Sequence, residues 1–245
     1  MFKLIFIFFI TAHILGDFYF QSDKLAERKI CCYKQVLLHS LIYLLVFIVC
    51  AVPFWSPPLL ICTVILSLAH FVIDNIKFYY LLKRRRRSVI YIADQIMHIA
   101  CMAAAALIFA RMAGELKLLP FIAGFLSSVT NDPFKILGWT GLILVICKPS
   151  NITIGSIVER YKPENISEVG FAEKNKIGAV IGSLERIIIS MLMGAGQYAA
   201  IGLVLTAKSV ARFNKISEDK QFAEYYLFGT LLSTAFAIGA YFIFI

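Results

Sequence analysis

Charged residues are scarce in this 245-residue chain, where Asp, Glu, Lys and Arg make up 16% of the sequence. A soluble domain carries about 25%. Hydrophobic residues make up 60%, and the mean hydropathy is +0.80. No low-complexity or disordered linker interrupts the long apolar runs. This composition argues against an ordinary soluble domain and predicts an integral membrane protein.

Several familiar motifs are also missing. Without a G-x-x-x-x-G-K-[ST] loop, a G-x-S-x-G elbow or a G-x-G-x-x-G fingerprint, nucleotide motors, serine hydrolases and dinucleotide enzymes have no support. The six cysteines form no C-x-x-C pair, so neither a zinc ribbon nor a disulfide framework is expected. The first 20 residues contain one lysine and no small-residue cleavage site, which favours a spanning helix over a signal peptide.

Apolar segments near the roughly 20 residues of a spanning helix occur at 2–20, 35–54, 59–82, 89–112, 133–150, 178–210 and 224–245. The run 178–210 is too long for one span and is interrupted by GAGQ at 194–197, which predicts a broken or re-entrant hairpin. We therefore expect an all-α, polytopic helical bundle of about seven to eight membrane segments. We divide it into a four-helix domain at 1–112 and a C-terminal domain at 113–245.

Lysine and arginine set the expected orientation. The loop 21–34 and the run KRRRR at 83–87 are basic. The turn PFWSPP at 53–58, which connects the second and third predicted spans, has no charge. The positive-inside rule then puts both basic loops in the cytoplasm and the N-terminus outside. The segment 113–132 is expected at the outer surface and the charged stretch 151–177 in the cytoplasm. The net charge of +9 thus indicates anionic lipid rather than nucleic acid as a partner.

All four histidines fall within predicted spans, and three have an aspartate four residues away, on the same helix face. These pairs are His13 with Asp17, His70 with Asp74, and Asp94 with His98. Chance gives this spacing to roughly 5% of histidines at this aspartate content. Together with His39, the pairs predict one polar cavity near the cytoplasmic ends of the first four spans.

A metal site explains this cavity best. Each charged group in lipid costs at least about 2.5 kcal/mol, and crowded carboxylates need cations. Imidazole and carboxylate together suit zinc, manganese or iron, as one or two divalent ions. Gln21, Asn75, Lys77 and Gln95 neighbour the motifs and are expected to orient ligands or bind substrate. An ion or proton relay and a purely structural polar network are the alternatives.

The second half offers a different constellation. Glu185 and Arg186 interrupt an apolar helix, Lys208 and Arg212 share a helix face, and Tyr225 lies near the start of the last span. We predict a phosphate clamp formed by the three basic side chains, with the glutamate and the tyrosine beside it. The alternative is local ion pairing with ordinary interfacial basic residues.

The stretches HILGDFYFQSD, HFVIDNIK and ADQIMH, with a C-terminal block that begins IGSLERIII, resemble a bacterial family called domain of unknown function 3307. The resemblance covers residues 1–110 and 177–236 and implies no established activity. A more distant likeness is to bacterial inner-membrane proteins described as metal-dependent hydrolases. That likeness implies a metal site at the three His–Asp pairs.

Three functions follow as hypotheses. The first is a metal-dependent hydrolase of the bacterial inner membrane, acting from the cytoplasmic side on a lipid or lipid-linked phosphoester. The second is a divalent-cation or proton transporter that uses the same residues. The third is a non-catalytic membrane scaffold or sensor. The outer halves of the first four spans have little polar lining, which disfavours transport.

Overall fold

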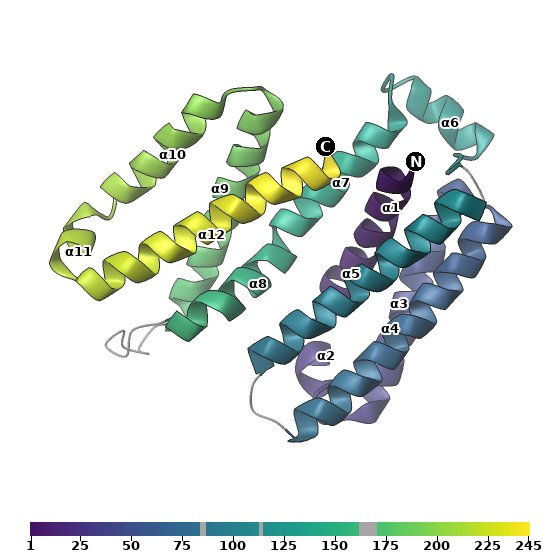
Figure 1. Ribbon diagram of the computed structural model, residues 1–245, viewed down its shortest axis with the longest axis horizontal. Coiled ribbons are helices and arrows are strands. Elements are labelled where there is room, and N and C mark those ends of the chain that lie inside the picture. The colour runs from purple at the N-terminus through teal and green to yellow at the C-terminus, as the bar shows by residue number, and fades with distance from the viewer. Residues whose placement is uncertain (84–86, 113–114, 162–170) are drawn as a thin grey trace. The chain divides into compact units, whose positions relative to one another are not determined.

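The computed structural model describes residues 1–83, 87–112, 115–161 and 171–245, which form helices and connecting turns without any strand (Figure 1). Seven helical segments of this described part are long and apolar enough to cross a membrane. They are Phe2–Tyr19, Tyr33–Phe54, Pro57–Leu81, Ser88–Met112, Pro133–Tyr161, Ile177–Gly194 and Lys220–Phe244. A shorter apolar helix covers Tyr198–Val210. The prediction of a polytopic helical bundle is confirmed.

The chain divides into two compact units, Met1–Gly141 and Leu142–Ile245. The boundary lies later than the division at 112–113 expected from the sequence. The reason is that residues after 112 pack into the N-terminal core: Leu116 is buried there, and Phe134 and Leu137 lie against it. Leu119 also donates its backbone N–H to the carbonyl of Pro53, which fixes this segment beside the first hairpin turn.

The N-terminal unit is built on four spans. Its elements are α1 (Phe2–Ile14), the π-helical turn η1 (Leu15–Tyr19), α2 (Asp23–Arg28), α3 (Tyr33–Ala51), the 3₁₀ turn η2 (Val52–Phe54), α4 (Pro57–Lys83), α5 (Arg87–Met112), α6 (Pro120–Ser127) and most of α7 (Pro133–Ile146). Helix α1 packs against α5 and α3, and α4 packs between α3 and α5. The outer flanks remain apolar and exposed, as at Leu41, Leu45 and Val49 of α3, which is the pattern of lipid-facing helices.

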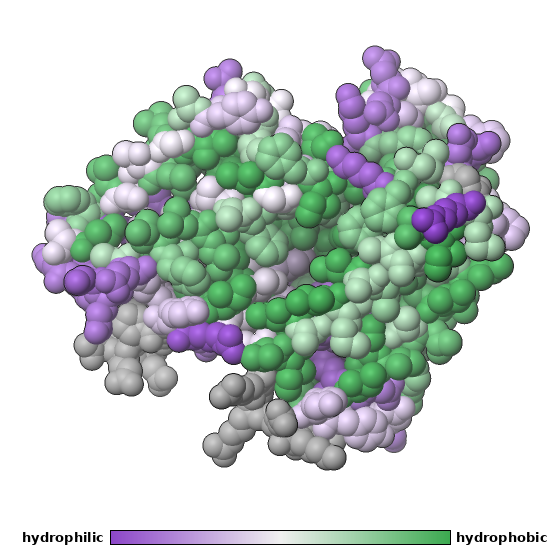
Figure 2. Space-filling view, in the orientation of Figure 1, coloured by the Kyte–Doolittle hydropathy of each residue, from purple (hydrophilic) through white to green (hydrophobic). Residues whose placement is uncertain are grey.

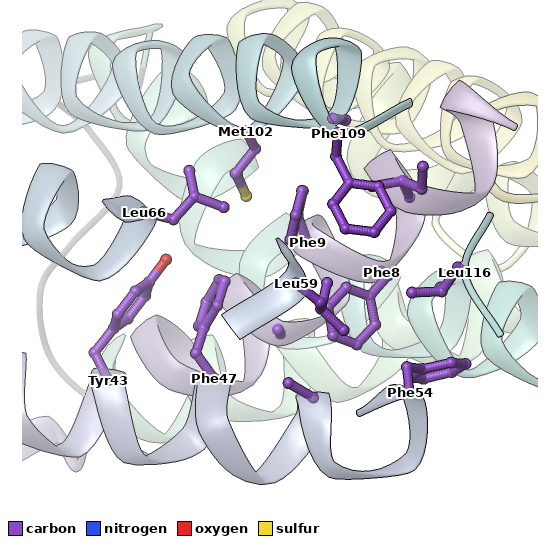
Figure 3. Packing of buried hydrophobic residues seen from close by; sticks show 14 residues of the cluster. Phe8, Phe9, Tyr43, Phe47, Phe54, Leu59, Leu66, Met102, Phe109 and Leu116 are labelled. Atoms are coloured by element: carbon purple, nitrogen blue, oxygen red, sulfur yellow. The ribbon is translucent and has the colours of Figure 1, made fainter. Parts of the chain in front are cut away.

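One half of this unit is filled by hydrocarbon. Phe8, Phe9, Phe47, Phe54, Leu59 and Phe109 belong to a single buried cluster (Figure 3). The Phe8 and Phe54 rings meet edge to face with centroids 5.3 Å apart. Tyr43 lies at the margin of this cluster (Figure 3) and marks where the interior becomes polar.

The C-terminal unit contains the end of α7, α8 (Lys148–Val158), the 3₁₀ turn η3 (Glu159–Tyr161), α9 (Phe171–Gly194), α10 (Tyr198–Val210), α11 (Phe213–Glu218) and α12 (Lys220–Phe244). Helix α9 ends at Gly194, and α10 runs back alongside it (Figure 1). Gly196, with φ of +69°, makes the reversal in a conformation that favours glycine. The predicted broken hairpin is confirmed.

The fifth span continues further than its apolar run. Helix α7 ends at Ile146, and Pro149 in the first turn of α8 lacks the N–H that would continue one regular helix. Apart from the turn at Cys147, the chain stays helical through Tyr161, whereas the apolar run in the sequence ends at residue 150. Asn151 is accommodated in the helix because Ser183 and Arg186 bind its side-chain amide.

Two basic or charged segments that are expected in the cytoplasm fall partly outside the described residues. These parts are 84–86 of the basic run 83–87 and 162–170 of the stretch 151–177. Hydrophobic residues cover the helix flanks visible in Figure 2, and hydrophilic residues gather near helix ends. Both units therefore carry the polarity pattern of membrane helices.

Candidate metal centre

Four spans place the predicted His and Asp side chains in one buried cluster. It consists of His13 and Asp17 from α1 and η1, His39 from α3, His70 and Asp74 from α4, and Asp94 and His98 from α5. None of the seven is more than 7% exposed. Each helix contributes through residues on its interior face, since four-residue spacing aligns them along one side. We call these seven residues the His/Asp cluster.

The first span changes from α-helix to a π turn where Asp17 lies. π turns are rare and frequently occur at functional sites. Gly16 in this turn permits a close contact, because a Cβ there would lie 2.8 Å from Cδ2 of Tyr43. The Tyr43 hydroxyl is then 3.0 Å from Nδ1 of His13, and its ring stacks on His70 with centroids 3.7 Å apart. The glycine therefore lets Tyr43 position two histidines.

One oxygen of each buried carboxylate is held by a side-chain donor. The pairs are Asp17 Oδ2 with Gln95 Nε2 at 3.1 Å, Asp74 Oδ2 with Lys29 Nζ at 2.8 Å, and Asp94 Oδ2 with Lys77 Nζ at 2.7 Å. These donors fix the orientation of the carboxylates. They leave the opposite oxygen, Oδ1, as the atom that each aspartate can offer to a ligand.

Seven polar atoms of the cluster are buried without a hydrogen-bond partner among the described residues. They are both ring nitrogens of His39, both ring nitrogens of His70, Oδ1 of Asp74, Oδ1 of Asp94 and Nε2 of His98. Leaving a buried polar group unsatisfied costs about 1–3 kcal/mol. So many unsatisfied atoms in one cluster need an explanation, and a bound ion or water would satisfy them.

Two distances between these atoms are close to those between the ligands of a tetrahedral metal ion. Asp17 Oδ1 lies 3.2 Å from His39 Nε2 and 3.6 Å from His70 Nε2. Both imidazole nitrogens nevertheless lack hydrogen-bond geometry. Four ligand atoms at about 2.0–2.1 Å around a tetrahedral zinc ion would lie roughly 3.3–3.4 Å apart. The three atoms all lie within 4.8 Å of one another, so they are close enough to bind one ion together.

Three groups of ligand atoms lie within 4.8 Å of one another. They are His13, His70 and His98; Asp17, His39 and His70; and Asp74, Asp94 and His98. His70 and His98 each belong to two groups, and their rings stack with centroids 4.4 Å apart. The donor set of imidazoles and carboxylates fits zinc, manganese or iron, and its size fits one or two ions.

Of the polar neighbours named from the sequence, Lys77 and Gln95 contact the cluster directly. Gln21 accepts a hydrogen bond from Lys29 at 3.0 Å and so lies one contact away. Asn75 instead donates to the backbone carbonyl of Phe71 in its own helix.

Sequence reasoning missed Lys29 and Tyr43. Lys29 belongs to the basic loop 21–34, where the sequence indicates only a role in orientation, but its side chain is 9% exposed and paired with Asp74. Tyr43 carried a usable signal, because it follows His39 by four residues and so shares its helix face.

A cavity of about 370 Å³ lies between α4 and α5 beside the cluster. Lys77 and Asp94 are its charged lining residues, and the remaining walls include Ile73, Ile76, Tyr80 and Met97. An apolar groove with an ammonium and a carboxylate at one place suits a ligand with a hydrocarbon part and a charged part.

Comparison with protein families gives one match. Residues 5–120 match the family described as Protein of unknown function (DUF3307). No curated protein and no solved structure matches the chain. The likeness to metal-dependent hydrolases therefore has no counterpart in these comparisons.

The DUF3307 match includes the whole His/Asp cluster together with Lys29, Tyr43 and Lys77. It does not extend to residues 177–236, where a resemblance to the family is also expected from the sequence. The predicted phosphate clamp thus lies outside the matched region.

The clamp residues gather around a second cavity, of about 480 Å³, within the C-terminal unit. Its lining includes all five predicted side chains, namely Glu185, Arg186, Lys208, Arg212 and Tyr225. Lys208 pairs with Glu185 at 2.6 Å. The structure therefore brings these five together around a cavity of their own.

Proposed function

We propose that the His/Asp cluster binds one or two divalent metal ions and that the protein hydrolyses a phosphoester of a lipid or lipid-linked substrate. The observation that carries this proposal is the set of seven buried nitrogen and oxygen atoms that have no hydrogen-bond partner among the described residues. A bound zinc, manganese or iron ion would act as a Lewis acid on a phosphoryl oxygen and activate water as a nucleophile.

A metal-free polar network is the main competitor. Lys29 and Lys77 already offset the charges of Asp74 and Asp94. However, each lysine contacts only Oδ2, and Oδ1 of both aspartates stays unsatisfied. Oδ1 of Asp94 lies 3.4 Å from Nε2 of His98, and carboxylates that bind a metal are commonly held by a hydrogen bond from a neighbouring side chain. The arrangement therefore favours a metal site.

The cavity between α4 and α5 supports a lipid-type substrate. Its apolar walls suit an acyl or prenyl chain, and Lys77 supplies a cation for an anionic head group. Asp94 belongs to both the cavity and the cluster, so a ligand in the groove would reach the proposed ions directly. The positive-inside rule supports access from the cytoplasmic face of a bacterial inner membrane.

The other half of the same helices favours an enzyme over a transporter. It is closed by the phenylalanine and leucine cluster around Phe9, Phe47 and Phe109. The buried hydroxyls of Thr11 and Ser67 bond to carbonyls of their own helices. A transport path would need polar lining that continues through this half.

Metal analysis tests the first step. Protein purified in detergent after growth with zinc, manganese and iron should retain metal, measured by inductively coupled plasma mass spectrometry. The Asp94→Ala/His98→Ala variant should lose at least about tenfold in metal affinity. Glu115→Gln, which alters an exposed carboxylate paired with Lys117, is the matched control. Equal, near-zero metal in all three proteins would overturn the proposal.

Phosphate release tests the second step. Mixed micelles of phosphatidic acid should release inorganic phosphate with the metal-loaded protein, and chelation should stop the reaction. Lys77→Met should lower the rate while metal remains bound. Bound metal without phosphate release, combined with metal-ion flux into proteoliposomes, would instead identify a transporter.

A further inference from the structure

Arg186 is a buried cation whose contacts are all neutral. It is 2% exposed, and its Nε donates to the carbonyl of Ile146 at 2.6 Å. Its Nη1 donates to Ser233 Oγ at 2.9 Å, and Nη2 donates to Asn151 Oδ1. No carboxylate of the described residues forms an ion pair with it. A buried charge without a counter-ion is strongly unfavourable, and a nearby anion would offset it.

Arg186 lines the 480 Å³ cavity of the C-terminal unit, and two more cations do so as well. Arg212 lies over the ring of Tyr226, 5.4 Å from its centroid, and has no carboxylate partner among the described residues. Lys208 is paired with Glu185, and its backbone carbonyl accepts the Tyr226 hydroxyl at 3.0 Å. Tyr226 thereby fixes both Arg212 and the end of α10 at the cavity.

The cavity has open space and apolar walls. Gly155 and Gly178 line it, and a Cβ on either would meet no atom within 4 Å. Ile154, Val158 and Ile181 form apolar parts of the lining. A ligand that fills this space combines an anionic group with a hydrocarbon or other organic part.

We propose that this cavity binds an organic phosphate, with Arg212 and Lys208 as donors to the phosphate and Arg186 supplying uncompensated positive charge. Three cations line the cavity against the carboxylates of Glu159 and Glu185. A phosphate, which carries more charge and more acceptor oxygens than a carboxylate, fits this excess. Its source is a lipid head group or a soluble phosphate ester. This site shares no residue with the proposed metal centre.

Equilibrium binding of radiolabelled lysophosphatidic acid to the full chain in detergent tests the site. A chelator is included throughout, so that the proposed metal centre cannot bind the phosphate. We expect saturable binding that Arg212→Gln weakens about tenfold. Gly155→Phe, which fills the open space, should abolish binding. Monoacylglycerol, which lacks only the phosphate, should not bind.

Two matched variants control for surface charge and for bulk. Lys215→Gln removes a cation that lies over Phe222 and does not line the cavity. Gly202→Phe adds the same bulk at a glycine outside it. Both should bind as the unaltered protein does. Competition by glycerol 3-phosphate identifies a soluble ester as the ligand class, whereas its failure identifies a lipid head group.

The proposal is overturned if monoacylglycerol binds as tightly as lysophosphatidic acid. It is also overturned if Gly155→Phe retains full binding, or if Arg212→Gln and Lys215→Gln weaken binding equally. Asp94→Ala/His98→Ala should leave this binding unchanged, so failure of the metal centre and failure of this site are separable.

Discussion

The two units bury charge in apolar helices by different means. In the N-terminal unit, acids, imidazoles and lysines share one interior, and Lys29 and Lys77 pair with Asp74 and Asp94 at 2.8 and 2.7 Å. In the C-terminal unit, the guanidinium of Arg186 is buried among neutral oxygens. The first arrangement compensates charge and leaves ligand atoms free. The second satisfies hydrogen bonds and leaves charge uncompensated.

The difference indicates what each interior lacks. Unsatisfied imidazole nitrogens and carboxylate oxygens accept a cation, so the N-terminal unit is suited to a metal ion. An arginine without a counter-ion beside an open cavity attracts an anion, so the C-terminal unit is suited to phosphate. The same comparison also predicts how each unit responds when its buried cation is removed.

The largest effect is expected from Lys29→Met. This change leaves Asp74 as a buried carboxylate without its cation, and breaking such a pair costs about 3–5 kcal/mol. The free energy of unfolding, measured in detergent with a chelator present, should fall by that amount. The double variant Lys29→Met/Asp74→Asn should recover most of it. Equal stability of the single and double variants would show that the pair is not a compensated buried charge.

A smaller loss, about 2 kcal/mol, is expected from Arg186→Met. This substitution removes the buried charge itself, so no unpaired charge remains. The cost comes from the neutral oxygens of Ile146, Asn151 and Ser233, which lose their hydrogen bonds from Arg186. The same unfolding measurement checks the value, and the metal content of the N-terminal unit should not change. A loss greater than that of Lys29→Met would contradict the distinction between the two interiors.

The smallest effect is expected from Tyr43→Phe. It keeps the ring stacked on His70 but removes the hydroxyl beside His13 Nδ1, so metal affinity should fall about tenfold. Competition with a chromophoric zinc chelator measures this affinity. Tyr33→Phe, at an exposed tyrosine that packs against Phe78, is the control and should have no effect. Equal affinities in both variants would argue against a role for the hydroxyl.

Much of the fold was predictable because its signals are local. Apolar runs of spanning length and the interruption at Gly194–Gly196 need no knowledge of tertiary contacts. The composition of the His/Asp cluster was accessible for the same reason, since four-residue spacing places two side chains on one helix face. The unit boundary was not accessible, because Leu116 and Leu137 join the N-terminal core through packing.

The sequence by itself determined that this protein is a bundle of membrane helices and that its histidines and aspartates share helix faces. Hydrophobic run length and residue spacing are sufficient for both. Only the tertiary structure decided that Lys29 pairs with Asp74 and that the Tyr43 ring packs against Gly16. It also decided that Arg186 donates hydrogen bonds to neutral partners from neighbouring elements. These contacts join residues far apart in the chain, and their geometry exists only once the helices have packed.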